Sequence, residues 1–273
     1  MEKLNKQLND TIITVCDTSP CRYGIPLHVF QTYKKDMPQS VKNGVLALRN
    51  QNPDFCFYLY TDDAMEHFIK ESFDMNVYNA FSRLKPMAYK SDLFRYCVLY
   101  KYGGIYMDIK LQMAGNNDLL SFLGETKYHV LDETNYTRNH KHFGGFIYQG
   151  FLVSKPNDPF YKDLIDTIVK HSETNFIGKN PLDITGPNMY WRVLQKHKSP
   201  VDDCETFTHK GYANIYYKGK LYVKGHDLNK YYADMGNKNR YYNMWPNNVY
   251  MSNVYFSLYS TIQHYFQIRK MGL

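Results

Sequence analysis

Apolar and polar residues alternate along the chain with two periods, one typical of strands and the other typical of helices. Residues 25–33 (IPLHVFQTY) are almost continuously apolar, which indicates a strand covered on both faces. Residues 37–53 (MPQSVKNGVLALRNQNP) carry apolar residues at helical spacing and end at an Asn-Pro pair. Residues 55–63 (FCFYLYTDD) indicate a second strand, and the Thr or Asp near its end caps the helix expected over 64–73.

The strongest helix pattern covers residues 85–102 (KPMAYKSDLFRYCVLYKY) and follows a shorter helix expected near 77–84. Pro86 stands at the start of the longer helix and Gly103 just past its end, where each residue type is favoured. The run GIYMDI, residues 104–109, then indicates a third strand.

Later segments repeat this order. Residues 144–156 (GGFIYQGFLVSKP) indicate a strand, and residues 158–171 and 185–196 indicate helices. Strands that alternate with helices imply βαβ units around a largely parallel sheet. From residue 210 onward the chain is rich in Tyr, Asn and Lys, and an amphipathic helix is expected over 253–273.

No internal repeat or flexible linker divides the chain, which is long enough to bury a sizeable core. We therefore expect one α/β domain over residues 1–273. It would comprise an N-terminal extension at 1–24, a core over about 25–200 and a C-terminal elaboration over about 201–273.

Composition narrows the class of protein. The net charge of +7 favours an anionic ligand, but no run of five basic residues and no nucleic-acid-binding motif is present, so no nucleic-acid partner is expected. Five cysteines without a C-x-x-C pair suggest neither a zinc ribbon nor a full disulfide framework. Cys97 lies in an apolar run and is expected to be a buried free thiol, and a reducing compartment is expected. No signal peptide or transmembrane segment is recognisable, so we expect a cytoplasmic or otherwise soluble protein. The Lys-, Asn- and Tyr-rich composition favours a bacterial or viral origin.

Three charged residues are candidates for binding a ligand. Asp108 ends the third strand, and ligands of open α/β sheets bind beyond the carboxyl ends of the strands. A carboxylate there can coordinate a divalent cation that bridges diphosphate oxygens. Asp92 and Arg95 share a helix face with the small residue Ala88 and can grip hydroxyl groups. The alternatives are a solvated Asp92–Arg95 salt bridge and a turn or cap role for Asp108.

The stretch SDLFRYCVLYKYGGIYMD, residues 91–108, resembles the core of the DXD sugar transferases of glycosyltransferase family 32. This family includes initiating α-1,6-mannosyltransferases and capsular polysaccharide enzymes, and the clostridial glucosylating toxins look related through the same block. The flanking segments IPLHVFQTY, NPDFCFYLYTDD, GFLVSKPNDPFYKDLI and TGPNMYWRVL also resemble family elements, in the same order. The likeness covers about residues 25–196, and several ordered elements are harder to meet by chance than one motif.

The resemblance implies a GT-A fold, with a Rossmann-like mixed sheet flanked by helices. It also implies a nucleotide-sugar donor (a UDP-sugar favoured, a GDP-sugar possible), retention at the anomeric carbon, and a glycan or glycoconjugate acceptor. By position, Asp92 and Arg95 would hold donor-sugar hydroxyls, and Asp108 would bind the metal or the ribose. Further binding residues would be Phe30, Gln31, Thr32 and Tyr60 around the base and ribose, the small residues Ala88, Gly103 and Gly104, Thr185 and Gly186 on the donor–acceptor side, and Trp245, for which a core position is the alternative.

The chain departs from the family pattern at Lys110, where the second acid of the DXD motif is expected. A charged lysine cannot ligate a metal, but it can neutralise a diphosphate as a point charge. We expect Mn²⁺ or Mg²⁺ to be kept at Asp108, held more weakly, with Lys110 supplying part of the charge. Two alternatives stay open: Lys110 points away from the site, or metal binding is lost in a non-catalytic relative.

The remaining acids and histidines receive no catalytic role. Asp132 and Glu133 lie in a polar stretch expected to be a loop, and no carboxylate nucleophile is expected. His129, His140 and His142 have no standard zinc spacing. The competing functions are a non-catalytic nucleotide-sugar or carbohydrate-binding relative and a toxin-like transferase that glycosylates proteins.

Overall fold

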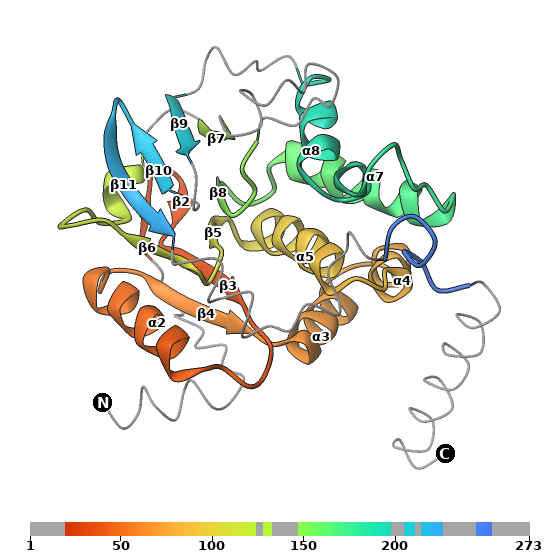
Figure 1. The fold of residues 1–273 in the computed structure, drawn as a ribbon, viewed down its shortest axis with the longest axis horizontal. Coiled ribbons are helices and arrows are strands. Elements are labelled where there is room, and N and C mark those ends of the chain that lie inside the picture. The colour runs from red at the N-terminus through yellow and green to blue at the C-terminus, as the bar shows by residue number, and fades with distance from the viewer. Residues whose placement is uncertain are drawn as a thin grey trace.

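The computed structural model describes residues 20–123, 128–132, 147–197, 205–210, 214–225 and 244–252. In these residues the helices are α2 (Gln39–Gln51), α3 (Asp62–Ser72), α4 (Met75–Arg83), α5 (Met87–Tyr102), α7 (Pro159–Glu173) and α8 (Pro187–Leu194), with the short 3-10 helices η1 (Leu120–Phe122) and η2 (Pro181–Asp183). The strands are β1 (Cys21–Arg22), β2 (Ile25–Pro26), β3 (His28–Thr32), β4 (Cys56–Tyr60), β5 (Gly104–Met107), β6 (Leu111–Met113), β7 (Tyr128–Asp132), β8 (Phe151–Ser154), β9 (Glu205–Lys210), β10 (Asn214–Tyr217) and β11 (Lys220–Gly225). Strands and helices alternate as the apolar pattern predicts (Figure 1).

A four-stranded sheet in the order β4-β3-β5-β8 lies at the centre of the fold (Figure 1). β3 runs parallel to β4 and β5, whereas β8 runs antiparallel to β5. The sheet is therefore mixed, and helices flank it, which is the arrangement expected of a GT-A fold. The apolar run 25–33 divides into two strands: β2 pairs with β1, and β3 belongs to the central sheet.

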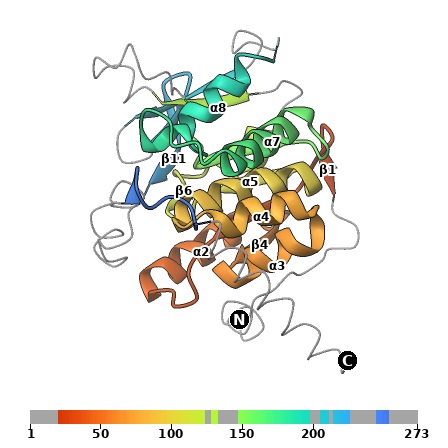
Figure 2. The same cartoon turned by 90° about the vertical axis from the view of Figure 1, so that its right-hand side faces the viewer.

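Alternate side chains of this sheet enter two separate apolar cores. Phe30, Tyr58 and Tyr106 belong to a core shared with α3, α4, α5, α7 and α8. Val29 and Ile105 belong to a second core, which is shared with α2, η1, β6, β10 and β11. Neighbouring strand residues point to opposite faces of the sheet, which is why they enter different cores. The face that carries Phe30, Tyr58 and Tyr106 is covered by most of the helices. Figure 2 shows those helices stacked beside one another on that side.

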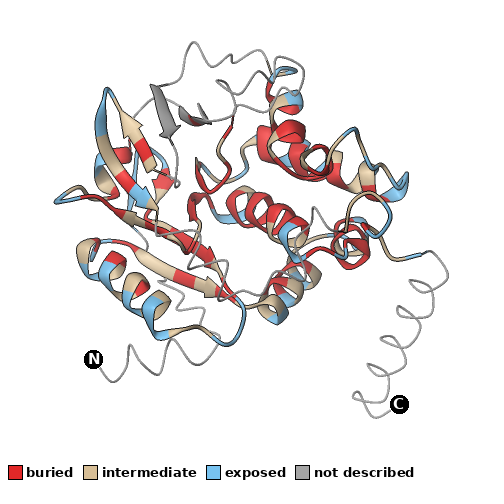
Figure 3. Ribbon diagram, viewed as in Figure 1, coloured by how far each residue is buried: buried red, intermediate tan, exposed pale blue. Residues whose placement is uncertain are grey.

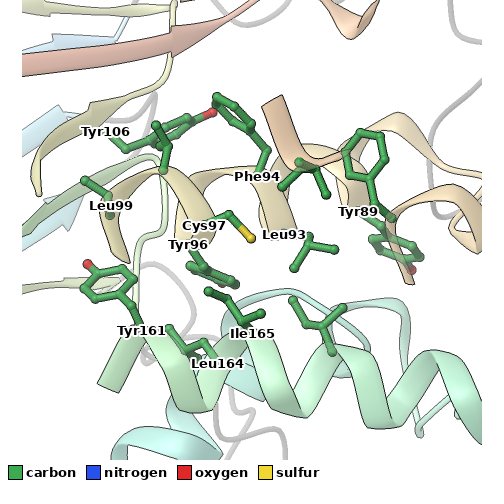
Figure 4. Close-up of a cluster of buried hydrophobic side chains, with 14 of the residues drawn as sticks. Tyr89, Leu93, Phe94, Tyr96, Cys97, Leu99, Tyr106, Tyr161, Leu164 and Ile165 are labelled. Atoms are coloured by element: carbon green, nitrogen blue, oxygen red, sulfur yellow. The ribbon is translucent and has the colours of Figure 1, made fainter. Parts of the chain in front are cut away.

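Helix α5 is buried on nearly all sides, between the central sheet and α7 (Figure 3). Phe94 lies toward the Tyr106 side, while Tyr96 and Cys97 face Leu164 and neighbouring residues of α7 (Figure 4). A helix in such a central position buries residues around most of its circumference. Its charged residues Asp92 and Arg95 are therefore buried, whereas Lys101 near its C-terminal end is exposed.

A second, five-stranded sheet has the order β6-β11-β10-β9-β7. Its edge strands β6 and β7 come from the first half of the chain, and its three middle strands come from the C-terminal portion. The sequence pattern did not predict this sheet. Its pairing joins the predicted core to the predicted elaboration.

Residues 244–252 also tie the C-terminal portion to the helical side of the fold. The backbone amide of Lys85 donates to the carbonyl of Val249 at 2.8 Å, and the amide of Met251 donates to the carbonyl of Arg83 at 2.8 Å. Within the described residues, no helix combines the length and the apolar character needed to cross a bilayer. The amphipathic helix expected over 253–273 lies outside the described residues.

The described cysteines bear on the expected compartment. Cys21 and Cys97 are free thiols, as expected for a reducing setting. Cys56, however, is disulfide-bonded. Disulfides are rare where thiols are kept reduced, so this bond differs from what a reducing compartment predicts.

Candidate active site

The predicted charged residues meet at the carboxyl edge of the central sheet. β5 ends at Met107, so Asp108 emerges there, beside the start of the antiparallel strand β8. Helix α5 runs back along the sheet toward β5, which brings its first half to the same edge. A pocket of about 230 Å³ opens at this place. Its walls are Ala88, Tyr89, Asp92, Arg95, Asp108, Ile147, Tyr148, Gln149, Gly150, Pro181, Leu182, Gly186 and Pro187.

Asp92 is buried, and both of its carboxylate oxygens have partners. Oδ1 lies 3.1 Å from an amino group of Arg95, and Oδ2 accepts a hydrogen bond of 2.7 Å from the hydroxyl of Thr185. Burial raises the pKa of Asp92 to about 6, although Arg95 and Thr185 both favour the ionised form. Asp92 and Arg95 thus form the ion pair that their spacing allows, but in a buried pocket wall rather than on a solvated face.

Arg95 lies between two carboxylates. Its NH2 atom is 3.9 Å from Oδ1 of Asp108, and its NH1 atom donates to the carbonyl of Gln149 at 2.8 Å. The guanidinium carbon stands 4.6 Å from the centre of the Tyr106 ring. Burial alone would lower the pKa of Arg95, but Tyr106 and the carboxylates of Asp92 and Asp108 outweigh it and raise the pKa. The side chain is therefore a permanent cation with a fixed direction.

Contacts of both its backbone and its side chain fix the position of Asp108. Its amide donates to the carbonyl of Gly150 at 2.7 Å. A side-chain carbon at Gly150 would meet the hydroxyl of Tyr148 and lie 2.7 Å from Oδ2 of Asp108, so a larger residue there would displace these side chains. Burial would raise the pKa of Asp108, but Lys110 and Arg95 outweigh it and keep the pKa below its usual value. The carboxylate is therefore ionised.

Lys110 faces the site. Its ammonium nitrogen lies 3.1 Å from Oδ2 of Asp108 and 5.9 Å from the centre of the Tyr148 ring. The side chain is 14% exposed. The alternative in which Lys110 points away is therefore wrong.

These residues do not fit a divalent metal ion. Mg²⁺ and Mn²⁺ are held by several oxygen ligands, usually with more than one carboxylate around the ion or a substrate phosphate beside it. In the described part of the chain, no three His, Cys, Asp or Glu side chains gather into a possible metal site. The two oxygens of Asp108 face Lys110 and Arg95, which are both cations.

Three other predicted residues lie at or behind the pocket. Ala88 and Gly186 form part of its wall. Thr185 stands behind the wall and fixes Asp92 through its hydroxyl group. Helix α5 and the segment before α8 thus meet at this pocket, and the binding roles of these three residues stay predictions.

The residues predicted around the base and ribose lie on β3 and β4, away from the described pocket walls. Phe30 and Tyr60 are core side chains. Thr32 forms a hydrogen bond of 3.2 Å with the Tyr106 hydroxyl. Gln31 is 1% exposed, and neither atom of its side-chain amide has a hydrogen-bond partner among the described residues. Their binding roles stay predictions.

Gly103, Gly104 and Trp245 are also placed away from this pocket. Gly103 follows α5 and Gly104 begins β5, at the opposite end of the strand from Asp108, where they shape the turn after α5. Trp245 packs against the main core, and its indole nitrogen donates to the carbonyl of Ile177 at 2.7 Å. Trp245 is half-buried at this place, and its binding role stays a prediction.

The sequence pattern missed the segment that closes the pocket opposite α5. Residues 147–150 were expected within a strand, but β8 begins only at Phe151. Gln149 supplies the carbonyl that orients Arg95, and its side-chain amide donates to the Tyr96 hydroxyl. A polar residue followed by glycine inside an apolar run was the available signal of a turn.

The predicted polar loop that follows residue 128 begins as a strand. His129 and Asp132 lie in strand β7, so this part of the expected loop is a strand. Glu133, His140 and His142 lie outside the described residues. Their assignments stay predictions.

Residues 38–122 match the family described as a glycosyltransferase sugar-binding region containing DXD motif. This range includes the helix that carries Asp92 and Arg95, and also Asp108 and Lys110.

Three relatives illustrate the similarity. A mannosyl phosphorylinositol ceramide synthase of Saccharomyces cerevisiae is 34% identical over 94 residues, which is 34% of this chain and 24% of the relative. Inositol phosphoceramide mannosyltransferase 2 of Schizosaccharomyces pombe is 23% identical over 185 residues, which is 67% of this chain and 50% of the relative. An uncharacterised glycosyltransferase of Acanthamoeba polyphaga mimivirus is 29% identical over 107 residues, which is 37% of this chain and 38% of the relative.

Among solved structures, a PaToxG glycosyltransferase overlaps 72% of this chain and 76% of its own, with a TM-score of 0.46 and 15% identity. This likeness is too distant to assign a function.

Proposed function

Since residues 38–122 match the family of glycosyltransferase sugar-binding regions that contain a DXD motif, we propose that the protein is a retaining glycosyltransferase. Its donor would be a nucleotide sugar, with a UDP-sugar favoured and a GDP-sugar as the second choice. Its acceptor would be a glycan or a glycoconjugate. The observation that carries this proposal is the position of Arg95, between the carboxylates of Asp92 and Asp108 on the wall of one pocket.

The buried end of the pocket suits the donor sugar. Asp92 accepts hydrogen bonds, Arg95 donates them, and both are held in place by Thr185 and Gln149. Polar groups that are fixed before the ligand arrives bind it without a further cost of ordering. We assign Asp92 and Arg95 to the hydroxyl groups of the transferred sugar.

The Asp108 side of the pocket suits the diphosphate. Cleaving the bond between a sugar and a diphosphate develops positive charge on the sugar and negative charge on the leaving phosphate. Fixed cations beside the phosphate stabilise this separation more in the transition state than in the ground state. Arg95 and Lys110 are the described cations on this side.

The base and ribose would lie farther along the same edge of the sheet, near β3 and β4. Gln31 supports this placement, because a buried amide without a partner gains stability when a ligand supplies hydrogen bonds. Phe30 and Tyr60, which are packed in the core, would then support the residues that bind the base and ribose.

The expected divalent cation is not used in this mechanism. Families with a DXD motif generally bind such a cation. In this chain the ligand position two residues after Asp108 is occupied by Lys110, and the described residues do not fit a metal.

The fungal relatives are named as mannosyltransferases that act on inositol phosphoceramide, or as the corresponding synthases. Their names place a mannose donor and a lipid-linked acceptor among the compounds to be tried.

The proposal is tested by screening UDP-, GDP- and TDP-sugars for thermal stabilisation and then for release of the nucleoside diphosphate. We expect one donor to raise the melting temperature of the native protein and to be turned over. Arg95→Lys should lower turnover by about 100-fold, because lysine cannot span two carboxylates and a ligand. Asp166→Asn is the control, since Asp166 is exposed on α7 and pairs with Lys162.

The outcomes separate the competing functions. A donor that binds but is never turned over, with or without an acceptor, would support the non-catalytic relative. Transfer to proteins instead of glycans would support the toxin-like transferase. Absence of binding by every nucleotide sugar would contradict the proposal.

A further inference from the structure

The ammonium group of Lys110 lies where a metal-binding acid is expected. Lys110 follows Asp108 by two residues, in the turn closed by the hydrogen bond from the amide of Leu111 to the carbonyl of Asp108 at 2.9 Å. Ile109 is buried in a small core on the far side of this turn. The turn sends the lysine side chain back to Oδ2 of Asp108, at 3.1 Å.

The three charged residues of the pocket wall and Lys110, which pairs with Asp108, balance in charge. Asp92 and Asp108 contribute two negative charges, and Arg95 and Lys110 contribute two positive charges. With aspartate in place of Lys110, the net charge of these four side chains would fall from zero to −2. This difference equals the charge of one divalent cation.

A metal ion and the Lys110 ammonium would compete for the same oxygen. A divalent cation binds a carboxylate oxygen at about 2.0–2.6 Å, and the ammonium already stands 3.1 Å from Oδ2 of Asp108. The other oxygen faces Arg95 at 3.9 Å.

We propose that the Lys110 ammonium, together with the Arg95 guanidinium, takes the part of the divalent cation, so that this chain transfers sugar without a metal. This inference rests on the proposed function and specifies how the same site meets the diphosphate. Asp108 is then a positioning residue, which holds the ammonium toward the leaving group.

The transfer step balances without a metal or a further reactant. The bond between the anomeric carbon and the diphosphate oxygen breaks, and its electron pair leaves with the nucleoside diphosphate. The hydroxyl oxygen of the acceptor bonds to the anomeric carbon, and its proton passes to the departing phosphate. The two cations stabilise the negative charge that develops on that phosphate.

The first test measures Mn²⁺ binding to the full chain without any donor, by the loss of the free-ion signal in electron paramagnetic resonance. Lys110→Asp should bind Mn²⁺ about tenfold more tightly than the wild type, or more tightly still. Adding Asp108→Asn to Lys110→Asp should remove this gain. If Lys110→Asp does not fold, Lys110→Asn, which also removes the cation, takes its place.

This measurement needs no turnover. If no nucleotide sugar is ever turned over, the proposed function fails, while the comparison of Mn²⁺ affinities still decides the role of Lys110. A wild type that binds Mn²⁺ as tightly as Lys110→Asp would overturn the inference.

The second test measures donor turnover in excess chelator. Wild-type turnover should be unchanged, and Lys110→Met should lower it by about 100-fold or more. Lys162→Met is the matched control, because Lys162 also pairs with an aspartate, at 2.6 Å, but on the exposed face of α7. Loss of wild-type turnover in chelator, restored by added Mn²⁺, would also overturn the inference.

Discussion

Asp92 shows how burial changes the meaning of a common helix pair. An acid and an arginine three residues apart on an exposed helix contribute little to stability. On α5 the same pair lies in a pocket wall, where Thr185 and Arg95 satisfy the carboxylate and burial still raises its pKa to about 6. The charge is kept at a cost to folding, which is a common property of functional residues.

This cost predicts a specific pH dependence of stability. The pKa of Asp92 is about 6 in the folded protein and 3.8 for the ordinary side chain. Its stabilising contribution is therefore full below the lower value and is lost as the pH rises through the higher one. We expect the melting temperature of the wild type to rise relative to that of Asp92→Asn when the pH falls from about 8 to about 5.

The measurement is a pair of thermal unfolding series across this range. Asp166→Asn serves as the control, because Asp166 is exposed and its replacement should leave the difference from the wild type nearly constant. A constant difference between wild type and Asp92→Asn would rule out the raised pKa.

The sequence allowed the residues of the site to be predicted better than their directions. The spacing of Asp92 and Arg95 and the strand-end position of Asp108 were enough to bring them together. The direction of Lys110 was not predictable, because it depends on a turn whose buried residue, Ile109, is anchored by side chains distant in sequence. Gln149 was missed for the same reason, since its carbonyl acts only after β8 pairs with β5.

At the scale of elements, the turn between α5 and β5 positions the site from a distance. Gly103 ends the helix with a φ of 64°, and Gly104 begins the strand with a φ of 94°. A side-chain carbon at Gly104 would lie 2.7 Å from the carbonyl oxygen of His28 on the neighbouring strand β3. The glycine therefore allows β5 to pair closely with β3 and holds the register that ends at Asp108.

We predict that Gly104→Ala destabilises the protein by about 2 kcal/mol or more, because positive φ and a backbone clash act together. Thermal unfolding measures this change. Gly115→Ala is a matched control, since Gly115 has a φ of 58° but open space around the position of the missing carbon. It should cost about 1 kcal/mol. Equal losses in the two variants would contradict the role of the clash.

Long elements were predicted closely, and short ones were not. The pattern over 85–102 gave α5 because Pro and Gly mark its ends and its apolar run is long. The three-residue strand β6 carries no pattern of its own, and it exists because β11 pairs with it. Asp132 was expected in a polar loop but ends β7, whose pairing partner β9 lies about 77 residues later.

At the scale of the whole molecule, strands from both halves of the chain complete one sheet. β6 pairs with β11, and β7 pairs with β9. Residues 244–252 bind the helical side through the backbone of Arg83 and Lys85. We propose on this basis that core and C-terminal portion form one domain.

A single domain predicts a single cooperative unfolding transition. Differential scanning calorimetry should give one peak, with equal calorimetric and van't Hoff enthalpies. A first transition that removes the second sheet while the central sheet stays folded would contradict the prediction. The test is informative because the division near residue 200, expected from composition, would have allowed two units.

The second sheet could not be predicted because its pairings join distant segments, and local patterns carry no information about such partners. The central sheet could be predicted because its parallel strands are joined by helices, and those helices are recognisable from the periodicity of their apolar residues. The composition of the C-terminal portion indicated short strands but not the edges they would cover.

The pairing of β11 with β6 has a practical consequence for anyone who seeks a minimal enzyme. A fragment ending near residue 200 would keep every described charged group of the pocket, yet it would bare the backbone of Leu111, Gln112 and Met113 along one edge. Unpaired strand edges recruit other chains. Shortened forms of this protein are therefore expected to self-associate and precipitate, which would prevent measurement of their activity.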